Sequence, residues 1–324
     1  MDLKKKVILV TGGTGKIGRH LVSRLISEGA FVKVISRSEK NPWDLDPHIE
    51  ILKLDLLDEM ALRQVILNCD YVFHLAVHQD TQDRNIDNFK RVNVDATKVI
   101  LSAAGSCRSL KKIIYVSTAM IFESTPKGIA TEAWPQKACC QGDYYLETKI
   151  QALQYVRRQI QNLPIVIVYP TAVIDLDDFH GSAPAKPGTL QYFLWEKIGG
   201  GIPGGLVNLI GPGKRRFNYV MMENLVDGLV NAALRGEPAQ EYILSGHNIE
   251  ACEYLKSVSK RMKRKSVSFR IPVFFFKILS LFGRFIKIPE IINIIANGDY
   301  ADRCFSFEKA RRAFGYEARL RIED

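Results

Sequence analysis

Short apolar runs alternate with amphipathic stretches along the first half of the chain. The apolar runs predict strands at 6–10, 31–36, 49–53, 71–75, 112–117 and 164–169, and the stretches between them predict helices at 17–27, 58–67, 86–104 and 143–161. Runs such as Val-Ile-Leu-Val lack the alternation of a half-exposed strand, so we expect these strands to be buried on both faces. Strands that alternate with helices favour βαβ units. The pattern therefore predicts an α/β fold with a doubly wound parallel sheet.

The pattern changes after Pro170. Residues 181–214 are dense in glycine and proline, which predicts long loops. A helix is expected at about 222–235 and a strand at 241–245, and the tail that follows is basic and predicted to be helical.

Composition narrows the class of protein. The 324 residues are 47% hydrophobic and 25% charged, which is ordinary for a globular protein and excludes disordered, collagen-like and coiled-coil chains. Six cysteines without a Cys-x-x-Cys pair favour neither a disulfide scaffold nor a zinc site, so we expect no metal. No uncharged stretch nears the roughly 18 residues of a membrane span, and the apolar run at 7–10 is too short for a signal peptide. We therefore expect a cytoplasmic protein.

Most of the net charge of +10 lies near the C-terminus, where residues 251–324 carry 16 Lys and Arg against 8 Asp and Glu. Such a region could face nucleic acid, an anionic membrane or a phosphorylated substrate, or it could be a solvated face. It lacks a nucleic-acid reading motif, so we expect no nucleic-acid partner. Within it, residues 272–288 place apolar and basic side chains on opposite helical faces. That pattern fits peripheral membrane contact or a helix packed on its own domain.

A glycine-rich turn lies between the first predicted strand and the first predicted helix. It reads Thr11-Gly-x-x-Gly-x-x-Gly18. Glycines at these spacings allow a tight turn, a close approach of the backbone to a pyrophosphate, and close packing of helix on strand. The helix start then offers free N–H groups to the anion. The turn predicts a dinucleotide site, and the alternative is a glycine turn without a ligand.

Further motifs follow in order along the chain. They are Asp55-Leu56-Leu57-Asp58, Phe73-His74-Leu75-Ala76, Asn93-Val94-Asp95-Ala96-Thr97, Val116-Ser117-Thr118-Ala119, Tyr145-x-x-x-Lys149 and Tyr169-Pro170. With these motifs the chain resembles the extended short-chain dehydrogenase/reductase family, which includes sugar-nucleotide epimerases, dehydratases and dihydroflavonol reductase-like enzymes. The resemblance covers about the first 175 residues and returns at 218–227, but little of it extends into 250–324.

The resemblance implies a Rossmann domain over 1–175, completed by about 217–246, and a smaller C-terminal substrate-capping lobe formed by 176–216 and 247–324. It implies that Asp55 accepts a hydrogen bond from the adenine amino group and that 75–77 lie under the nicotinamide ribose. The expected cofactor-binding residues are Gly12, Thr14, Gly15, Lys16, Ile17, Arg37, Asp55, Leu56, Leu75, Ala76, Val77, Tyr145, Lys149, Pro170 and Val173. The family also implies a homodimer through the helices at 86–104 and 143–161.

Tyr145 and Lys149 are four residues apart on a predicted helix, so their side chains share a face. A free phenol, with a pKa of about 10, transfers protons poorly at neutral pH, and a nearby ammonium group stabilises the phenolate. Thr118 ends a strand, and its hydroxyl could hold the reacting oxygen beside Tyr145. We therefore expect Thr118, Tyr145 and Lys149 to be catalytic, with Lys149 also bonded to the nicotinamide ribose. The alternative is a surface pair that arises by chance.

The second predicted strand ends in Ser36-Arg37-Ser38, where NAD-binding proteins place an acidic residue. A guanidinium group flanked by hydroxyls suits a 2′-phosphate. We therefore expect NADP as the cofactor, with NAD as the alternative. A solvated Arg37 would leave that choice open.

These features predict an NAD(P)-dependent oxidoreductase that transfers a hydride between nicotinamide and a hydroxyl/carbonyl pair of a small-molecule substrate. A nucleotide-sugar epimerase or dehydratase with retained NAD is one alternative. It is weakened because Ile121-Phe122-Glu123 replaces the Val-Tyr-Gly that is common in that group. A non-catalytic dinucleotide sensor is another alternative, but it leaves Thr118, Tyr145 and Lys149 unexplained.

Weaker candidates complete the sequence reading. His78 could border the substrate or act as a structural donor. Cys139 and Cys140 have no neighbour in the sequence that would lower their pKa, so we expect no redox role. Arg215 and Arg216 could meet a substrate phosphate or be solvated.

Overall fold

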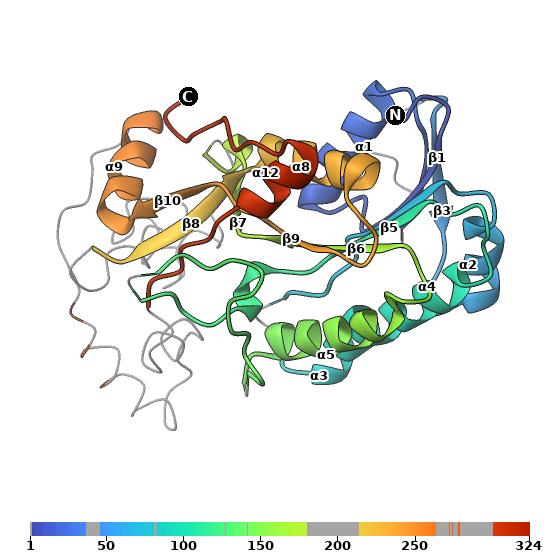
Figure 1. Cartoon of the computed structure of the whole chain (residues 1–324), viewed down its shortest axis with the longest axis horizontal. Coiled ribbons are helices and arrows are strands. Elements are labelled where there is room, and N and C mark those ends of the chain that lie inside the picture. Colours follow the sequence, from blue (N-terminus) through green and yellow to red (C-terminus); the bar gives the residue numbers. More distant parts are fainter. Residues whose placement is uncertain are drawn as a thin grey trace, which may run out of the picture.

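The computed structural model describes residues 2–36, 46–80, 83–126, 128–140, 142–179, 214–263 and 301–324, together with the single positions 272, 274 and 278. Its centre is a seven-stranded sheet in the order β3-β2-β1-β4-β5-β6-β9, in which every neighbouring pair is parallel (Figure 1). The strands are β1 (Val7–Thr11), β2 (Phe31–Ser36), β3 (Ile49–Lys53), β4 (Tyr71–His74), β5 (Lys112–Val116), β6 (Ile165–Pro170) and β9 (Glu241–Leu244). The predicted α/β fold with a parallel sheet is confirmed.

Helices cover both faces of this sheet. One face carries α1 (Lys16–Ser27), α8 (Met222–Arg235) and α12 (Glu308–Phe314), and the other carries α2 (Glu59–Ile66), α4 (Ala96–Ala104) and α5 (Tyr144–Gln159) (Figure 1). Successive strand residues point to opposite faces, so Ile8 and Val10 pack with α1 and α8 while Leu9 packs with α2 and α4. All three side chains are fully buried, which is why the strand reads as one apolar run.

Aspartates start two of the helices. Asp58 precedes α2 and accepts a hydrogen bond from the Ala61 N–H at 3.0 Å, while Asp143 precedes α5 and accepts one from the Leu146 N–H at 2.9 Å. Each carboxylate satisfies a backbone donor that the helix itself leaves free, and its charge favours the positive end of the helix dipole. The cap at Asp143 fixes the start of the helix that carries Tyr145 and Lys149.

The stretch predicted as one helix at 86–104 is helical throughout, but it changes type. It consists of α3 (Ile86–Phe89), the π-helical segment η1 (Lys90–Asp95) and α4. A π-helical turn contains one extra residue and shifts the side chains that follow it, and such turns are frequent at functional sites. Here it carries Asn93, which is 2% exposed and whose side chain contacts α5 and the segment after β4.

A second, smaller sheet has the order β10-β8-β7. Strand β8 (Arg216–Met221) pairs in parallel with β7 (Ala172–Ile174) and antiparallel with β10 (His247–Glu250), and α9 (Ala251–Arg261) packs against it (Figure 1). The sequence reading expected none of these three strands. The loops expected at 181–214 and most of the amphipathic segment at 272–288 lie outside the described residues. Within that segment, Phe274 and Ile278 are exposed.

Candidate active site

The glycine-rich turn begins at Gly12, directly after β1. Gly12 has a φ of +71°, and a Cβ atom there would lie 2.7 Å from the backbone nitrogen of Ala76. A Cβ atom on Gly18 would lie 2.1 Å from the Gly12 carbonyl oxygen. Both positions therefore require glycine, because the turn passes directly against the end of β4 and the first turn of α1 packs on it.

The start of α1 is open to an anion. Its N-cap residue is Gly15, which has no side chain to bond the first N–H groups, and the first turn contains no acidic residue. Thr14, Gly15 and Lys16 are exposed there, and Ile17 is half-buried. A helix start with free N–H groups and its positive dipole end suits a pyrophosphate, so the turn fits the predicted dinucleotide.

The other predicted cofactor residues gather at the same edge of the sheet, because parallel strands end on one side. Residues 75–77 follow β4 beside the glycine turn, Pro170 is the last residue of β6, and Val173 lies in β7. From β1 the chain adds β2 and β3 on one side of the sheet, and then returns to place β4 on the other side of β1. Open α/β sheets bind ligands at the point where the strand order reverses in this way.

Two further predicted cofactor residues, Asp55 and Leu56, follow the carboxyl end of β3 and have partners within the protein. Asp55 is exposed, and its carboxylate accepts hydrogen bonds from Arg91 at 2.6 Å and from the Leu57 N–H at 3.0 Å. Leu56 is half-buried and packs against the apolar cluster beneath α2 and α4. Arg37 lies outside the described residues, so its proposed contact with a 2′-phosphate stays a prediction.

A chain of hydrogen bonds through His74 fixes the end of β4. Thr97 Oγ1 donates to the Asn93 carbonyl at 2.7 Å, so His74 Nε2, 2.9 Å from that hydroxyl, must be the donor to it. His74 Nδ1 then accepts from Thr11 Oγ1 at 2.7 Å. Complete burial, and next the charge of Lys149, lower the pKa of His74 to about 3, so the ring is neutral. This neutral ring ties β1, β4 and the helix of Thr97 together.

Thr118, Tyr145 and Lys149 meet at the carboxyl end of β5. The Thr118 side chain lies close enough to the Tyr145 phenol to influence its pKa. Lys149 Nζ donates to the Val116 carbonyl at 2.8 Å, and the Lys149 residue is only 4% exposed. The three side chains predicted to be catalytic therefore come together, from one strand end and one helix.

Burial shifts the pKa of both ionisable members of this group. Burial raises the pKa of the Tyr145 phenol, the nearby Thr118 side chain opposes that rise, and the charge of Asp143 adds to it. Burial alone lowers the pKa of Lys149 to about 7. At neutral pH Tyr145 is thus a protonated acid, and Lys149 is poised between its charged and neutral forms. Such shifts are typical of proton-transfer sites.

Comparison with known proteins identifies the group to which this site belongs. The model of the family described as "NAD dependent epimerase/dehydratase family" matches residues 8–244. The chain belongs to that family. It is therefore an NAD(P)-dependent enzyme of the dehydrogenase or epimerase kind, which agrees with the extended short-chain dehydrogenase/reductase resemblance.

Individual relatives are distant. The chain is 26% identical over 274 residues to the sterol-4-alpha-carboxylate 3-dehydrogenase, decarboxylating, of Dictyostelium discoideum, a match that covers 81% of this chain and 77% of that protein. It is 28% identical over 231 residues to the uncharacterized protein y4nG of Sinorhizobium fredii, covering 70% of this chain. That match spans only about half, 53%, of the y4nG chain.

Solved structures share the fold. The Bordetella bronchiseptica enzyme WbmF in complex with NAD+ and UDP superposes with a TM-score of 0.69 at 21% identity, covering 99% of this chain and 90% of that one. At this identity the likeness shows the fold and not the substrate.

Sequence reasoning assigned no role to Asn93, which the structure places next to the catalytic helix. Its side-chain oxygen accepts from the His78 N–H at 2.7 Å, and its amide nitrogen donates to the His78 carbonyl at 3.0 Å and to Thr148 Oγ1 at 2.9 Å. Asn93 thus joins the segment after β4 to the helix that carries Tyr145. The signal in the sequence was a polar residue on an otherwise apolar helical face.

The weaker sequence candidates have structural partners. His78 Nε2 bonds Asp83 at 2.8 Å, and its ring packs edge-on against Phe89, which fits the structural alternative. Arg216 bonds Asp302, with 3.3 Å between Nε and Oδ2. Cys139 is exposed and Cys140 is half-buried, and neither takes part in a disulfide within the described residues.

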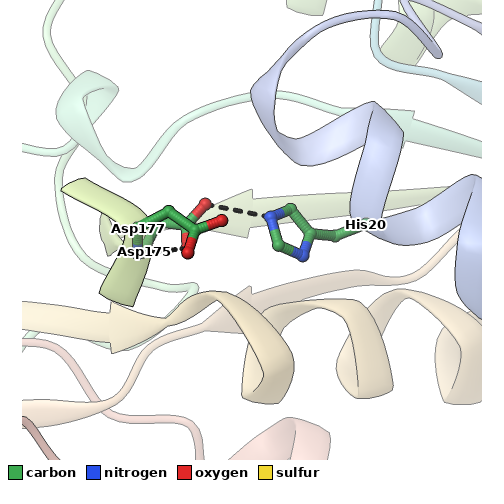
Figure 2. A group of neighbouring side chains, drawn as sticks. All are labelled: His20, Asp175 and Asp177. Atoms are coloured by element: carbon green, nitrogen blue, oxygen red, sulfur yellow. Dashed lines mark hydrogen bonds and ion pairs between the residues drawn. The ribbon is translucent and has the colours of Figure 1, made fainter. Parts of the chain in front are cut away.

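One cluster bears on the expectation that the protein holds no metal. His20 on α1 faces Asp175 and Asp177 in the segment after β7 (Figure 2). His20 Nε2 lies 2.9 Å from Asp175 Oδ2, and the ligand atoms of all three residues lie within 4.8 Å of one another. The ion pair ties the helix of the glycine turn to the second sheet. The expectation that the protein holds no metal therefore stays a prediction.

No helix in the described ranges is both long enough and apolar enough to cross a membrane.

Proposed function

We propose that the protein is an NAD(P)-dependent oxidoreductase that moves a hydride between nicotinamide and a hydroxyl/carbonyl pair of a small-molecule substrate. The observation that carries this proposal is the position of Tyr145 beside Thr118 and the buried Lys149, at the strand edge that also holds the glycine turn. The Tyr145 acid, the Thr118 hydroxyl that orients the substrate and the Lys149 amine that tunes the acid lie together at the edge where an open parallel sheet binds a dinucleotide.

Each side chain has one task in this reaction. The bound dinucleotide supplies or accepts the hydride. Thr118 holds the substrate oxygen beside Tyr145. In the reducing direction the Tyr145 O–H gives its proton to that oxygen as the carbonyl carbon gains the hydride, and the phenolate that remains is stabilised by the Lys149 ammonium group. In the oxidising direction the phenolate takes the hydroxyl proton back. Lys149 also bonds the nicotinamide ribose.

The proposal assigns the cofactor to the edge described above. The residues proposed to contact it are Gly12, Thr14, Gly15, Lys16, Ile17, Arg37, Asp55, Leu56, Leu75, Ala76, Val77, Tyr145, Lys149, Pro170 and Val173. The open start of α1 supports the pyrophosphate contact. The proposed preference for NADP depends on Arg37 and on the lack of an acid at that strand end.

An epimerase or dehydratase that retains NAD is the second candidate. It is supported by the family, which contains such enzymes, and opposed by the replacement of Val-Tyr-Gly with Ile121-Phe122-Glu123. A non-catalytic dinucleotide sensor would use the glycine turn but would have no need for a buried lysine beside a tyrosine and a threonine.

The two enzyme candidates differ in what happens to the cofactor. A reductase must release the oxidised dinucleotide after each turnover, whereas an epimerase restores its cofactor in every cycle. We expect protein purified without added nucleotide to be mostly empty and to oxidise NADPH when offered a panel of ketones and aldehydes. Quantifying the dinucleotide released on denaturation, per chain, together with NADPH absorbance decides between them. Near-stoichiometric NAD with no NADPH consumption would establish the epimerase instead.

The remaining assignments are proposals of the same kind. They are a Rossmann domain of 1–175 completed by 217–246, a capping lobe of 176–216 and 247–324, a homodimer through 86–104 and 143–161, and a cytoplasmic location. Peripheral membrane contact through 272–288 is supported by the exposure of Phe274 and Ile278. Sedimentation with anionic and with neutral vesicles tests that contact, and light scattering tests the dimer.

A further inference from the structure

The Lys149 ammonium group lies in an almost dry corner, where the described part of the chain places no opposite charge. Its one hydrogen bond among the described residues goes to the Val116 carbonyl at 2.8 Å. The titratable side chains around this corner are His74 on β4, Tyr115 on β5 and Tyr145 on α5, and none of them is an acid that ionises at neutral pH. A buried ammonium group in such a place tends to lose its proton unless something replaces the lost water.

The side chain that replaces the water is an aromatic ring. Lys149 Nζ lies over the ring of Tyr115, 5.0 Å from its centroid. Tyr115 is 1% exposed and directly precedes Val116 on β5, so one strand supplies both the carbonyl and the ring. The ring of His74, fixed through both of its nitrogens, packs against Tyr115 at 5.9 Å between centroids. The ring under the lysine is therefore held in place.

We propose that Tyr115 is a positioning residue of the active site: the face of its ring holds the Lys149 ammonium group beside Tyr145 and keeps it charged. The negative face of an aromatic ring attracts a cation, and the attraction is strongest where water is excluded. The link to catalysis rests on the proposed function, because it is Lys149 that stabilises the Tyr145 phenolate there.

The hydroxyl group of Tyr115 contributes nothing to this role. It is buried, and no side chain or backbone group in the described part of the chain bonds it. Its removal should leave the protein at least as stable, because an unpaired buried hydroxyl group is costly. Phenylalanine keeps the ring face and should therefore replace Tyr115, whereas leucine removes the ring and should not.

The first test measures the protonation of Lys149 without any substrate. In protein labelled with ¹³C and ¹⁵N at lysine, NMR follows the side-chain signal of Lys149, assigned with Lys149→Arg, across pH. We expect Tyr115→Phe to titrate as the wild type does and Tyr115→Leu to titrate about one pH unit lower, a roughly tenfold weaker hold on the proton. Tyr71→Leu is the matched control, because Tyr71 is a buried tyrosine with Lys111 over its ring, 5.9 Å from the centroid, at the opposite end of the sheet. It should leave Lys149 unchanged.

A second series changes the charge of the ring but not its packing. Phenylalanine with one, two and three ring fluorines at position 115 weakens the negative ring face step by step. We expect the midpoint of the Lys149 titration to fall with each fluorine, while the melting temperature stays near that of Tyr115→Phe. An unchanged midpoint across this series overturns the proposal, whether or not Tyr115→Leu folds.

The same variants separate this inference from the proposed function. If the enzyme oxidises NADPH, the alkaline limb of kcat/KM should move to lower pH in Tyr115→Leu and in the fluorinated variants, but not in Tyr115→Phe. If the Lys149 midpoint follows the fluorine series but no carbonyl or hydroxyl substrate is turned over, Tyr115 still holds Lys149 and the proposed function fails. If turnover is found and the midpoint is flat, the inference alone fails.

Discussion

The two ends of strand β5 hold a lysine in opposite ways. At the amino end, Lys111 Nζ lies 3.0 Å from Asp70 Oδ1, and Lys6 approaches the same carboxylate group at 3.5 Å. The contact with the Asp70 carboxylate raises the pKa of Lys111, so it stays charged. At the carboxyl end, Lys149 is buried against a carbonyl and a ring with no carboxylate among its described partners, and burial lowers its pKa to about 7.

This difference in surroundings distinguishes a lysine that contributes to stability from a lysine that can take part in proton transfer. A half-exposed lysine paired with an acid contributes a little stability and has no proton to give at neutral pH. A buried lysine without a counter-charge costs stability, yet it titrates near neutral pH and can therefore change the properties of a neighbouring phenol. His74 at the end of β4 is also buried, and there burial lowers the pKa to about 3, so its ring stays neutral. The carboxyl edge of the sheet thus carries the groups proposed to be catalytic, and the amino edge carries ordinary ion pairs.

The largest expected effect tests whether the carboxyl edge is catalytic. Tyr145→Phe should lower turnover on the order of 10²–10⁴-fold, because it removes the proton donor. The affinity for NADPH should change little, since the ring remains. Tyr144→Phe, which alters the neighbouring residue of the same helix, is the matched control and should keep full turnover. Steady-state kinetics with fluorescence titration of NADPH measure both, and full turnover by Tyr145→Phe would refute the assignment.

The next effect concerns the glycine turn at this edge. Gly12→Ala should weaken dinucleotide affinity about tenfold or more, because its Cβ atom would lie 2.7 Å from the Ala76 nitrogen and push the turn away from β4. Gly29→Ala is the control: its φ of +77° imposes the same backbone strain, but its Cβ atom would meet only the Lys4 side chain at 3.4 Å. Both variants should lose about 1 kcal/mol of stability from that strain. Equal dinucleotide affinity in the two would show that the turn does not contact the cofactor.

The sequence predicted the central parallel sheet far better than the second, smaller sheet. Strands at the centre of the parallel sheet are buried on both faces and appear as continuous apolar runs, so β4, β5 and β6 begin and end within one residue of where the pattern placed them. Strands β7 and β10 are short and only partly buried, and β10 reads His-Asn-Ile-Glu, which no apolar pattern marks. Strand β8 is longer and mostly buried, but it begins with the polar and mixed run Arg-Phe-Asn.

The meeting of Tyr145 and Lys149 was predictable because their spacing is local: they are four residues apart on one helix. The surroundings that shift their pKa values were not, because they come from distant parts of the chain. Tyr115 lies 34 positions before Lys149, and the Asn93 amide bonds a threonine 55 positions away. A single sequence carries no signal for such contacts between strand and helix.

The smallest expected effect is a change in stability when either lysine is replaced, and we expect this change to have opposite signs for Lys149 and Lys111. Because burial lowers the pKa of Lys149 from 10.5 to about 7, the unfolded chain binds a proton between these pH values that the folded chain does not. Stability therefore rises with pH across this window, and the full penalty is present at and below pH 7. Lys149→Met removes the penalty, so it should stabilise the protein by about 1–3 kcal/mol at pH 7, less toward pH 10.

Lys111→Met should act the other way at the amino end of the same strand. Losing the half-exposed pair with Asp70 should cost about 0.2–1 kcal/mol at pH 7, and the loss should shrink in high salt, because exposed ion pairs are screened. Urea unfolding of both variants at pH 7 and pH 9.5, in low and high salt, measures these differences. A Lys149→Met variant that is destabilised at pH 7 by as much as Lys111→Met would mean that Lys149 has a counter-charge after all. The contrast between the two ends of β5 would then disappear, because both lysines would be ordinary paired charges.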